Sequence, residues 1–203
     1  MREILNSALP FLAILNPFAV CLYLAGVMED LSTRDFIKVF SWSSMISLFV
    51  FWIFMLSGEH FLITVLGVRP AALRIFGGLI FLVVGYNYAT KGYRAAEMLR
   101  GKLDELPSAI ALPYMIGAAT ITQSIIIGKN NSTIIGTMIL IVSIAVTFTV
   151  VILFKFIRDK MQESRGRIFD RYINILSRIN GLIIGTISTD MIVSGIHQIW
   201  ITG

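Results

Sequence analysis

The sequence predicts an all-α membrane protein with six transmembrane helices, arranged as two inverted three-helix repeats. Three observations predict this fold: the composition, six long apolar stretches, and matching segments in the two halves of the chain. Hydrophobic residues make up 56% of the 203 residues and charged residues 14%, against about 45–50% and about 25% in soluble domains. This composition excludes a water-soluble enzyme. We therefore expect a single transmembrane domain over residues 1–203.

Six stretches are long and apolar enough to cross a membrane, for which a helix needs roughly 20 mostly apolar residues. They cover residues 4–27, 36–57, 71–90, 108–128, 132–157 and 172–200. Charged connections follow the third stretch (91–105) and the fifth (158–171). We interpret the first stretch as a retained helix, because its apolar core is too long for a cleaved signal peptide.

The basic residues predict how the helices are oriented. If the helices alternate in direction, the 1–2, 3–4 and 5–6 connections lie on one side with twelve Lys and Arg residues, and the other side has three. The twelve are Arg34, Lys38, Lys91, Arg94, Arg100, Lys102, Lys155, Arg158, Lys160, Arg165, Arg167 and Arg171, and the three are Arg2, Arg69 and Lys129. Loops rich in Lys and Arg stay in the cytoplasm. We therefore predict a multi-pass protein of the cell membrane with both termini outside, whose net charge of +5 reflects topology rather than a nucleic-acid partner.

Two segments of the first half recur in the second half at nearly the same spacing. Ala-Leu-Pro-Phe-Leu at 8–12 returns as Ala-Leu-Pro-Tyr-Met at 111–115, and Leu-Arg-Ile-Phe-Gly-Gly-Leu-Ile at 73–80 returns as Ser-Arg-Ile-Asn-Gly-Leu-Ile-Ile at 177–184. We interpret residues 1–100 and 104–203 as repeats of a three-helix unit. Because three is odd, the second unit enters the membrane from the opposite side. Inverted repeats with interrupted helices are typical of secondary transporters.

The interruptions predict where a ligand binds. Asn16 and Pro17 lie in the middle of the first stretch, and small and hydroxyl residues at 117–122 occupy the matching part of the fourth. A broken helix offers free amides at one half-helix start and free carbonyls at the other end, which suit a carboxylate and an ammonium. The candidate substrate-binding residues are Asn16, Pro17, Phe18, Ala19, Gly117, Ala118, Ala119, Thr120 and Thr122. The alternatives are that Asn16-Pro17 is only a structural kink, and that the threonines only bond their own helix carbonyls.

Asp190 is the candidate ion-coupling residue. An ionisable group within a membrane helix is costly and by default functional, and Asn87 occupies the matching level of the third helix. The alternative is a structural pair with an arginine or a water-filled cavity. We find no metal-ligand cluster, no nucleotide loop and no nucleophile–base pair in the sequence, and so expect no catalytic residue, no metal and no cofactor besides a coupling H⁺ or Na⁺.

Several of these motifs together resemble the MarC-type membrane proteins. The resemblance lies in Ala8-Leu9-Pro10-Phe11 leading into Asn16-Pro17-Phe18, in Ser57-Gly58-Glu59, in Leu66-Gly67-Val68, in residues 72–78, and in the second half in Ala111-Leu112-Pro113, Gly117, Ile121-Thr122 and Arg178 with Gly181-Leu182. It implies kinship with the amino-acid exporter superfamily. It also implies a role like that of the SnatA-type archaeal members, which are described as transporters of glycine and alanine driven by a cation gradient.

The chain departs from that family at Gly117-Ala118-Ala119, where most members read Gly-Pro-Gly. We therefore expect a fourth helix that is less strongly broken. The predicted function is secondary active transport of small neutral amino acids by alternating access, and not catalysis. The alternatives are export of drugs or other metabolites, and a non-transporting scaffold or sensor; a homo-oligomer remains open. The predicted partners are the lipid bilayer and the small-molecule substrate.

Overall fold

The computed structural model describes residues 2–65, 67–92, 95 and 105–202, with side chains for all of these except 2–6, 59, 113, 162–170 and 201–202. This part of the chain is helical and contains no strand. Its elements are α1 (Arg2–Leu15), α2 (Pro17–Tyr23), α3 (Ala25–Asp30), α4 (Thr33–His60), η1 (Phe61–Val65), α5 (Pro70–Lys91), α6 (Leu106–Ile110), η3 (Ala111–Met115), α7 (Ala118–Asn130) and α8 (Thr133–Thr202).

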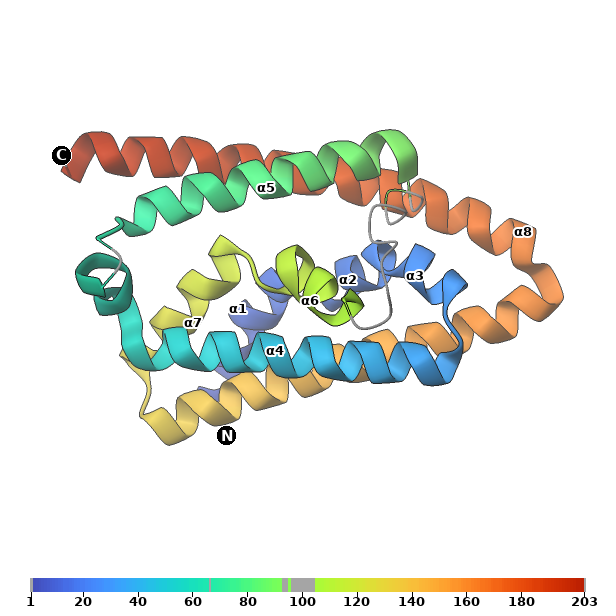
Figure 1. Ribbon diagram of the computed structural model, residues 1–203, viewed down its shortest axis with the longest axis horizontal. Coiled ribbons are helices and arrows are strands. Elements are labelled where there is room, and N and C mark those ends of the chain that lie inside the picture. The colour runs from blue at the N-terminus through green and yellow to red at the C-terminus, as the bar shows by residue number, and fades with distance from the viewer. Residues whose placement is uncertain (1, 66, 93–94, 96–104, 203) are drawn as a thin grey trace.

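Long helices form the two outer layers of the molecule (Figure 1). Four segments are long and apolar enough to cross a membrane: Thr33–Gly58 in α4, Pro70–Lys91 in α5, and Thr133–Met161 and Arg171–Trp200 in α8. In Figure 1, α4 lies beside the first part of α8, α5 lies beside the last part, and the short helices lie between these layers. The predicted second, third, fifth and sixth helices are thereby confirmed as apolar helices of sufficient length.

The charged connection predicted at 158–171 is not a loop, which corrects the sequence prediction. α8 continues through it as helix and turns back on itself between its two apolar spans (Figure 1). Residues 158–171 contain four arginines and one each of Lys, Met, Gln and Glu, which are good helix formers, and they contain no proline, so helix is compatible with this segment. The charged residues therefore separate the two apolar spans of α8 without ending the helix. Of the other predicted connection, residues 93–94 and 96–104 lie outside the described residues.

The first apolar segment is broken, as predicted, at Asn16. The backbone of Asn16 is left-handed (φ 45°, ψ 76°), so α1 stops and α2 begins at Pro17. A proline disfavours helical backbone angles at the residue before it, and asparagine tolerates left-handed φ better than most residues. Its side chain then caps α2 by accepting a 3.1 Å hydrogen bond from the amide of Ala19. By contrast, Pro10 lies inside α1 without ending it.

The fourth apolar segment is also broken, although it lacks the proline that the family resemblance implies at 118. Leu112, which precedes Pro113, has extended backbone angles (φ −110°, ψ 121°), and Ile116 and Gly117 are extended as well. The pre-proline restriction explains the first departure from helix. Thr120 explains the second, because its hydroxyl accepts a 2.9 Å hydrogen bond from the amide of Gly117 and so fixes the start of α7. The expected weakening of this break is therefore wrong.

Glycines let α5 and the last part of α8 approach closely. A Cβ on Gly85 would lie 2.7 Å from the amide nitrogen of Gly185, and one on Gly78 would lie 2.9 Å from the carbonyl oxygen of Ser188. Such contacts between backbones require residues without side chains. The pair of helices is consequently a tightly joined unit that forms one wall of the interior.

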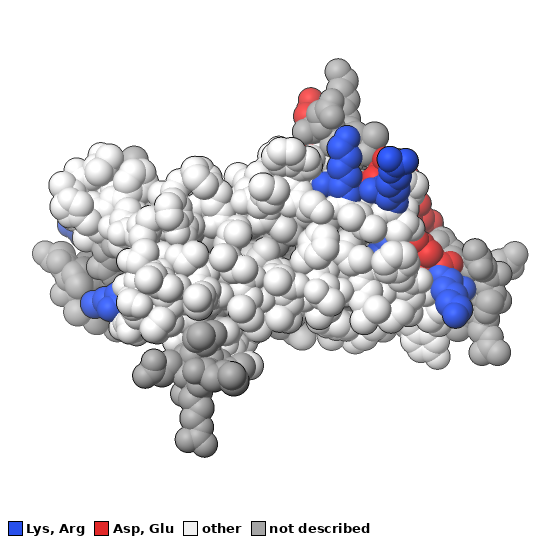
Figure 2. Space-filling view, turned by 90° about the horizontal axis from the view of Figure 1, so that it is seen from below, with Lys and Arg blue, Asp and Glu red and all other residues white. Residues whose placement is uncertain are grey.

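Charged side chains gather at one end of the molecule, where α3, the start of α4 and the turn of α8 meet; we call this the charged end (Figure 2). Lys155 is buried there, and its Nζ donates to the carbonyl of Met28 (2.8 Å) and to Oδ1 of Asp159 (2.6 Å). Arg158, also buried, pairs with Glu29 at 3.1 Å. These contacts tie the end of α3 to α8.

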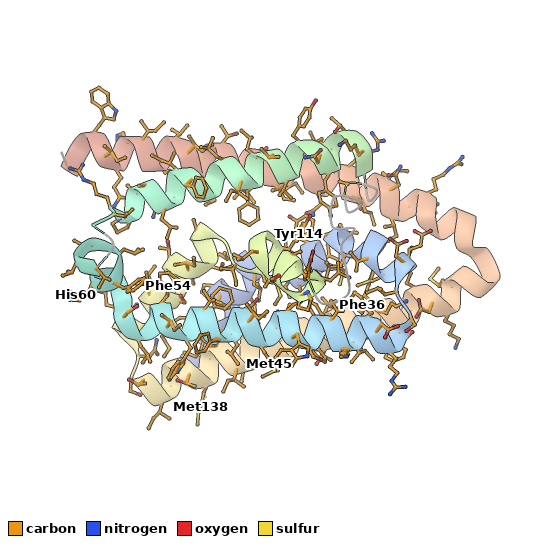
Figure 3. All side chains as sticks on the ribbon, viewed as in Figure 1. Phe36, Met45, Phe54, His60, Tyr114 and Met138 are labelled. Carbon is orange, nitrogen blue, oxygen red and sulfur yellow. The ribbon has the colours of Figure 1, made fainter. Side chains whose placement is uncertain are left out.

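The flanks between the two ends are apolar. Met45 on α4 and Met138 on α8, which Figure 3 labels, are both exposed. Trp42, Phe49 and Leu153 are exposed as well. Exposed large apolar side chains on every long helix suit contact with lipid tails. The core lies between the layers, and its largest cluster joins α1, α4 and α7 around Phe11, Phe40 and Phe51.

Candidate functional site

A cavity of about 230 Å³ lies where the two broken segments meet. The end of α1, the Asn16 break and α2 form one side of it, and η3 and the start of α7 form another. Phe81 of α5 and the residues Ile184, Ile187, Ser188 and Met191 of α8 complete the wall. Residues from both halves of the chain therefore build a single site.

The first break contributes Asn16 and Ala19 to this cavity. The oxygen of the Asn16 amide group is engaged with the amide of Ala19, so the orientation of the side chain is fixed. Pro17 acts from the backbone, since it starts α2 with a preset φ and no N–H group. Phe18 is 52% exposed and is not part of the cavity wall.

The second break contributes Ala119 and Thr120. The buried Thr120 hydroxyl lies 2.9 Å from the carbonyl oxygen of Gly117 and 3.1 Å from that of Met115, and it can donate to either of them. Gly117 and Ala118 face α5 instead, where a Cβ on Gly117 would lie 2.8 Å from Cζ of Phe81. Ala118 packs against Gly77. These two residues position α7 and do not line the cavity.

Thr122 does not reach the cavity. Its hydroxyl donates to the carbonyl of Ala118 at 2.8 Å, one turn earlier in α7. The sequence left two roles open for the threonines of this segment. The structure brings Thr120 to the cavity and leaves Thr122 bonded to its own helix.

Three tyrosines border the cavity toward the charged end. Tyr23 and Tyr114 line it, and Tyr88 of α5 packs behind them. The ring centroid of Tyr23 lies 5.0 Å from that of Tyr88 and 5.1 Å from that of Tyr114. The hydroxyl of Tyr88 donates a 2.7 Å hydrogen bond to the carbonyl of Tyr23, the last residue of α2. Figure 3 shows Tyr114 in the interior, between the layers of α4 and α5.

Every side chain that lines the cavity is uncharged. Its electrostatic character is therefore set by hydroxyls and by helix ends. The carbonyl end of α1 and the amide end of α7 both face it, through residues 13–15 and through Ala119 and Thr120. The first carries partial negative charge and the second partial positive charge. Such a site can receive a neutral molecule that has separated charges.

The profile of one membrane-protein family, MarC family integral membrane proteins, matches residues 1–200. The chain belongs to the MarC family. Its curated relatives include UPF0056 membrane proteins of Aquifex aeolicus and of Pyrococcus horikoshii, each 24% identical to it. Each alignment covers 96% of this chain, with 92% of the Aquifex protein and 94% of the Pyrococcus protein. No solved structure matches the chain.

Two residues predicted for ion coupling lie away from the cavity of this MarC-family chain. Asp190 is exposed on α8, although its neighbours Ser188 and Met191 line the cavity. Asn87 is buried in α5, and its Nδ2 donates to the carbonyl of Val83 at 2.8 Å. The structure does not bring either side chain to the two breaks, and a coupling role for them stays a prediction.

Sequence reasoning missed Tyr23, Tyr114, Phe81 and Ser188 in the MarC-family cavity. Tyr114 directly follows the second Ala-Leu-Pro motif, at 111–113, so the repeated sequence indicates the segment to which Tyr114 belongs. No local signal marks the other three, because their place in the wall depends on how α2, α5 and α8 pack.

Proposed function

We propose that this protein is a secondary active transporter of small neutral amino acids of the glycine and alanine class. The observation that carries the proposal is the single uncharged cavity onto which both helix breaks open. Discontinuous helices that meet at one site are the usual binding architecture of secondary transporters.

The polarity of the cavity suits a zwitterion. A carboxylate is stabilised by the first amides of α7, at Ala119 and Thr120, where the helix dipole is positive. An ammonium is stabilised by the last carbonyls of α1, which have no partner within that helix. A ligand with a net charge would meet no opposite side-chain charge in this wall and would lose its hydration without compensation.

The size of the cavity argues for a small ligand. Sites for drug-sized molecules typically enclose about 300–1,000 Å³, and this cavity encloses about 230 Å³. Ala19 and Ala119 in the wall are small, which suits a substrate whose side chain is a hydrogen or a methyl group. The size therefore favours glycine and alanine over the alternative of drug export.

Alternating access is supported by further correspondences between the halves. α4 and α8 both start at the threonine of a Ser-Thr pair, at 32–33 and at 132–133, and the hydroxyls of Ser32 and Ser132 each accept from the amide three residues ahead. One hundred residues also separate the buried pair Ser43 and Ser47 of α4 from Ser143 and Thr147 of α8, with the same hydrogen bonds to the carbonyl one turn earlier. An inverted repeat of six helices supplies two equivalent arrangements, open to opposite sides.

The proposed orientation has the charged end in the cytoplasm and both termini outside, following the distribution of Lys and Arg. The proposal includes coupling to a H⁺ or Na⁺ gradient. Because the cavity wall has no carboxylate, we assign ion coupling either to Asp190 in another conformation or to backbone carbonyls at the breaks.

A thermal-shift screen of the purified protein tests the proposal. A ligand that binds only the folded state at 100 times its Kd stabilises it by about 2.7 kcal/mol. We expect glycine and alanine to raise the Tm, and aspartate, lysine and phenylalanine to leave it unchanged, in series with and without Na⁺ and across pH. The absence of any shift with glycine and alanine in all series would contradict the proposal. A shift only with bulky apolar compounds would favour export of other molecules, and a stable copurifying protein would favour a scaffold.

A further inference from the structure

A row of buried side chains on α8 leads from the cavity toward the charged end. Ile173, Ser177, Asn180, Ile184 and Ser188 are all buried and lie on one face of the helix, at spacings of three or four residues. Ile184 and Ser188 line the cavity. At the other end, Ile173 packs against Leu22 and Ala25, which belong to α2 and α3.

The polar members of this row differ in how they are satisfied. The hydroxyl of Ser188, at the cavity, donates to the carbonyl of Ile184 at 2.6 Å. Within the described residues, the Oγ of Ser177 makes no hydrogen bond, although this side chain is fully buried. Asn180 is 7% exposed, and its side chain interacts with Tyr23. A buried hydroxyl without a partner is costly, and native proteins keep few such groups without a functional reason.

The tyrosine cluster stands between this polar row and the cavity. Tyr23, which lines the cavity, lies within hydrogen-bonding reach of Asn180. It is held by ring contacts with Tyr88 and Tyr114 and by the hydrogen bond from the Tyr88 hydroxyl to its own carbonyl. Because that carbonyl ends α2, loss of the Tyr88 bond would free the end of α2 as well as the Tyr23 ring.

We infer that Ser177 and Asn180 form the charged-end half of the substrate pathway, closed in this structure by Tyr23 against Tyr88 and Tyr114. The inference rests on the proposed function. In the alternate state, the two polar side chains meet the zwitterion or its water after Tyr23 moves away, which explains why they are kept in an apolar environment.

Cysteine accessibility tests this inference in the full-length protein reconstituted in liposomes. The single native cysteine is first replaced (Cys21→Ser), and a reporter is then introduced as Ser177→Cys. Ser143→Cys is the matched control, since Ser143 is equally buried on the same helix but bonds the carbonyl of Ile139 in the α4-facing layer. The probe is a small positively charged methanethiosulfonate, applied with and without glycine or alanine.

We expect the Ser177→Cys protein to react at about 0.1–10% of the rate of an exposed Lys160→Cys reporter. The reason is that Ser177 is accessible only in the alternate state, and a minor state of this kind typically has a population of about 0.1–10%. The Ser143→Cys protein should stay unreactive. Adding Tyr88→Phe should speed the reaction of the Ser177 reporter about fivefold, which is the effect of losing one hydrogen bond from the closed state. Glycine or alanine should change the rate of the Ser177 reporter and leave the Lys160 reporter unaffected.

Two results would overturn the inference. One is a Ser177→Cys reporter no more reactive than Ser143→Cys in a protein that still takes up glycine or alanine, which leaves the proposed function intact. The other is equal reactivity with and without Tyr88→Phe. If the reporter reacts as expected but neither glycine nor alanine alters its rate or is taken up, the proposed substrate class fails, and the opening of this path stands on its own.

Discussion

Asn16 and Thr120 lie on the wall of the same cavity, although they belong to different halves of the chain. Each uses its side-chain oxygen to accept a backbone amide beside a helix break: Asn16 that of Ala19, three residues ahead, and Thr120 that of Gly117, three residues behind. The two breaks are thus stabilised by equivalent means in opposite chain directions. The proposed ligand site lies between these two breaks.

Replacing Asn16 by glycine separates its structural role from its binding role. Glycine accepts the left-handed backbone at this position without strain, and a glycine cap costs only a few tenths of a kcal/mol relative to asparagine. We therefore expect Asn16→Gly to fold with nearly unchanged Tm and to lose the stabilisation by glycine and alanine. Thermal unfolding with and without ligand measures both effects. Retained stabilisation would mean that Asn16 is a structural kink only.

The Thr120 hydroxyl is expected to be required for the second break. Thr120→Val keeps the shape of the side chain but leaves the Gly117 amide without its acceptor, at a cost of about 1–3 kcal/mol. Thr120→Ser keeps the hydroxyl and should restore both the Tm and ligand binding. Equal behaviour of the two variants in thermal unfolding would show that the methyl group matters and the hydroxyl does not.

The close approach of α5 and α8 predicts different effects for two glycines of α8 that lie one helical turn apart. A Cβ on Gly181 would lie 2.7 Å from the carbonyl carbon of Tyr88, whereas one on Gly185 would meet nothing within 4 Å. Gly181→Ala should therefore destabilise the protein by about 1–3 kcal/mol. Gly185→Ala should be neutral, or stabilising by up to about 1 kcal/mol through helix propensity. The Tm values of the two variants in detergent give the comparison, and a lower Tm for Gly185→Ala would count against this packing.

Lys155 is expected to anchor α3 to α8 at the charged end. Its removal in Lys155→Met takes away the Lys155 donor from the carbonyl of Met28 and the lysine partner of Asp159. We expect a loss of about 1–3 kcal/mol in stability, toward the lower end because Asp159 is 32% exposed and keeps its bond from Thr33. Lys160→Met, at an exposed position on the same helix, is the control and should leave the Tm unchanged. Equal Tm values for the two variants would rule out this anchor.

The apolar helices and the first break could be predicted because each depends on local chemistry. Asn16 precedes a proline and tolerates left-handed φ, so the sequence alone indicates where α1 must end. The small and hydroxyl residues at 117–122 also predict the region of the second break. The absence of the proline that the family resemblance implies predicts a weaker break, but Leu112, before Pro113, and the Thr120 hydroxyl maintain it. Pro10, the repeat equivalent of Pro113, leaves α1 helical, so tertiary context decides between two similar motifs.

The rest of the site depends on packing that no local pattern reveals. Tyr23 and Ser188 reach the cavity because α2 and α8 lie side by side, and their neighbours in sequence resemble any apolar helix. Asp190 was singled out by its charge, yet its position on the helix directs it away from the cavity, while Met191 and Ser188 line the wall. The side of a helix that faces a cavity cannot be read from hydropathy when every side of the helix is apolar.

Uptake of radiolabelled glycine and alanine into proteoliposomes tests the central claim most directly. Parallel liposomes contain Thr120→Val, with Gly185→Ala as the control for a substitution outside the site. Under an imposed H⁺ or Na⁺ gradient, the account predicts uptake by the unmodified protein and by Gly185→Ala, and at least about tenfold less by Thr120→Val, which corresponds to 1.4 kcal/mol or more of lost ligand interaction. No uptake by the unmodified protein under any gradient, or uptake that Thr120→Val leaves unchanged, would contradict it.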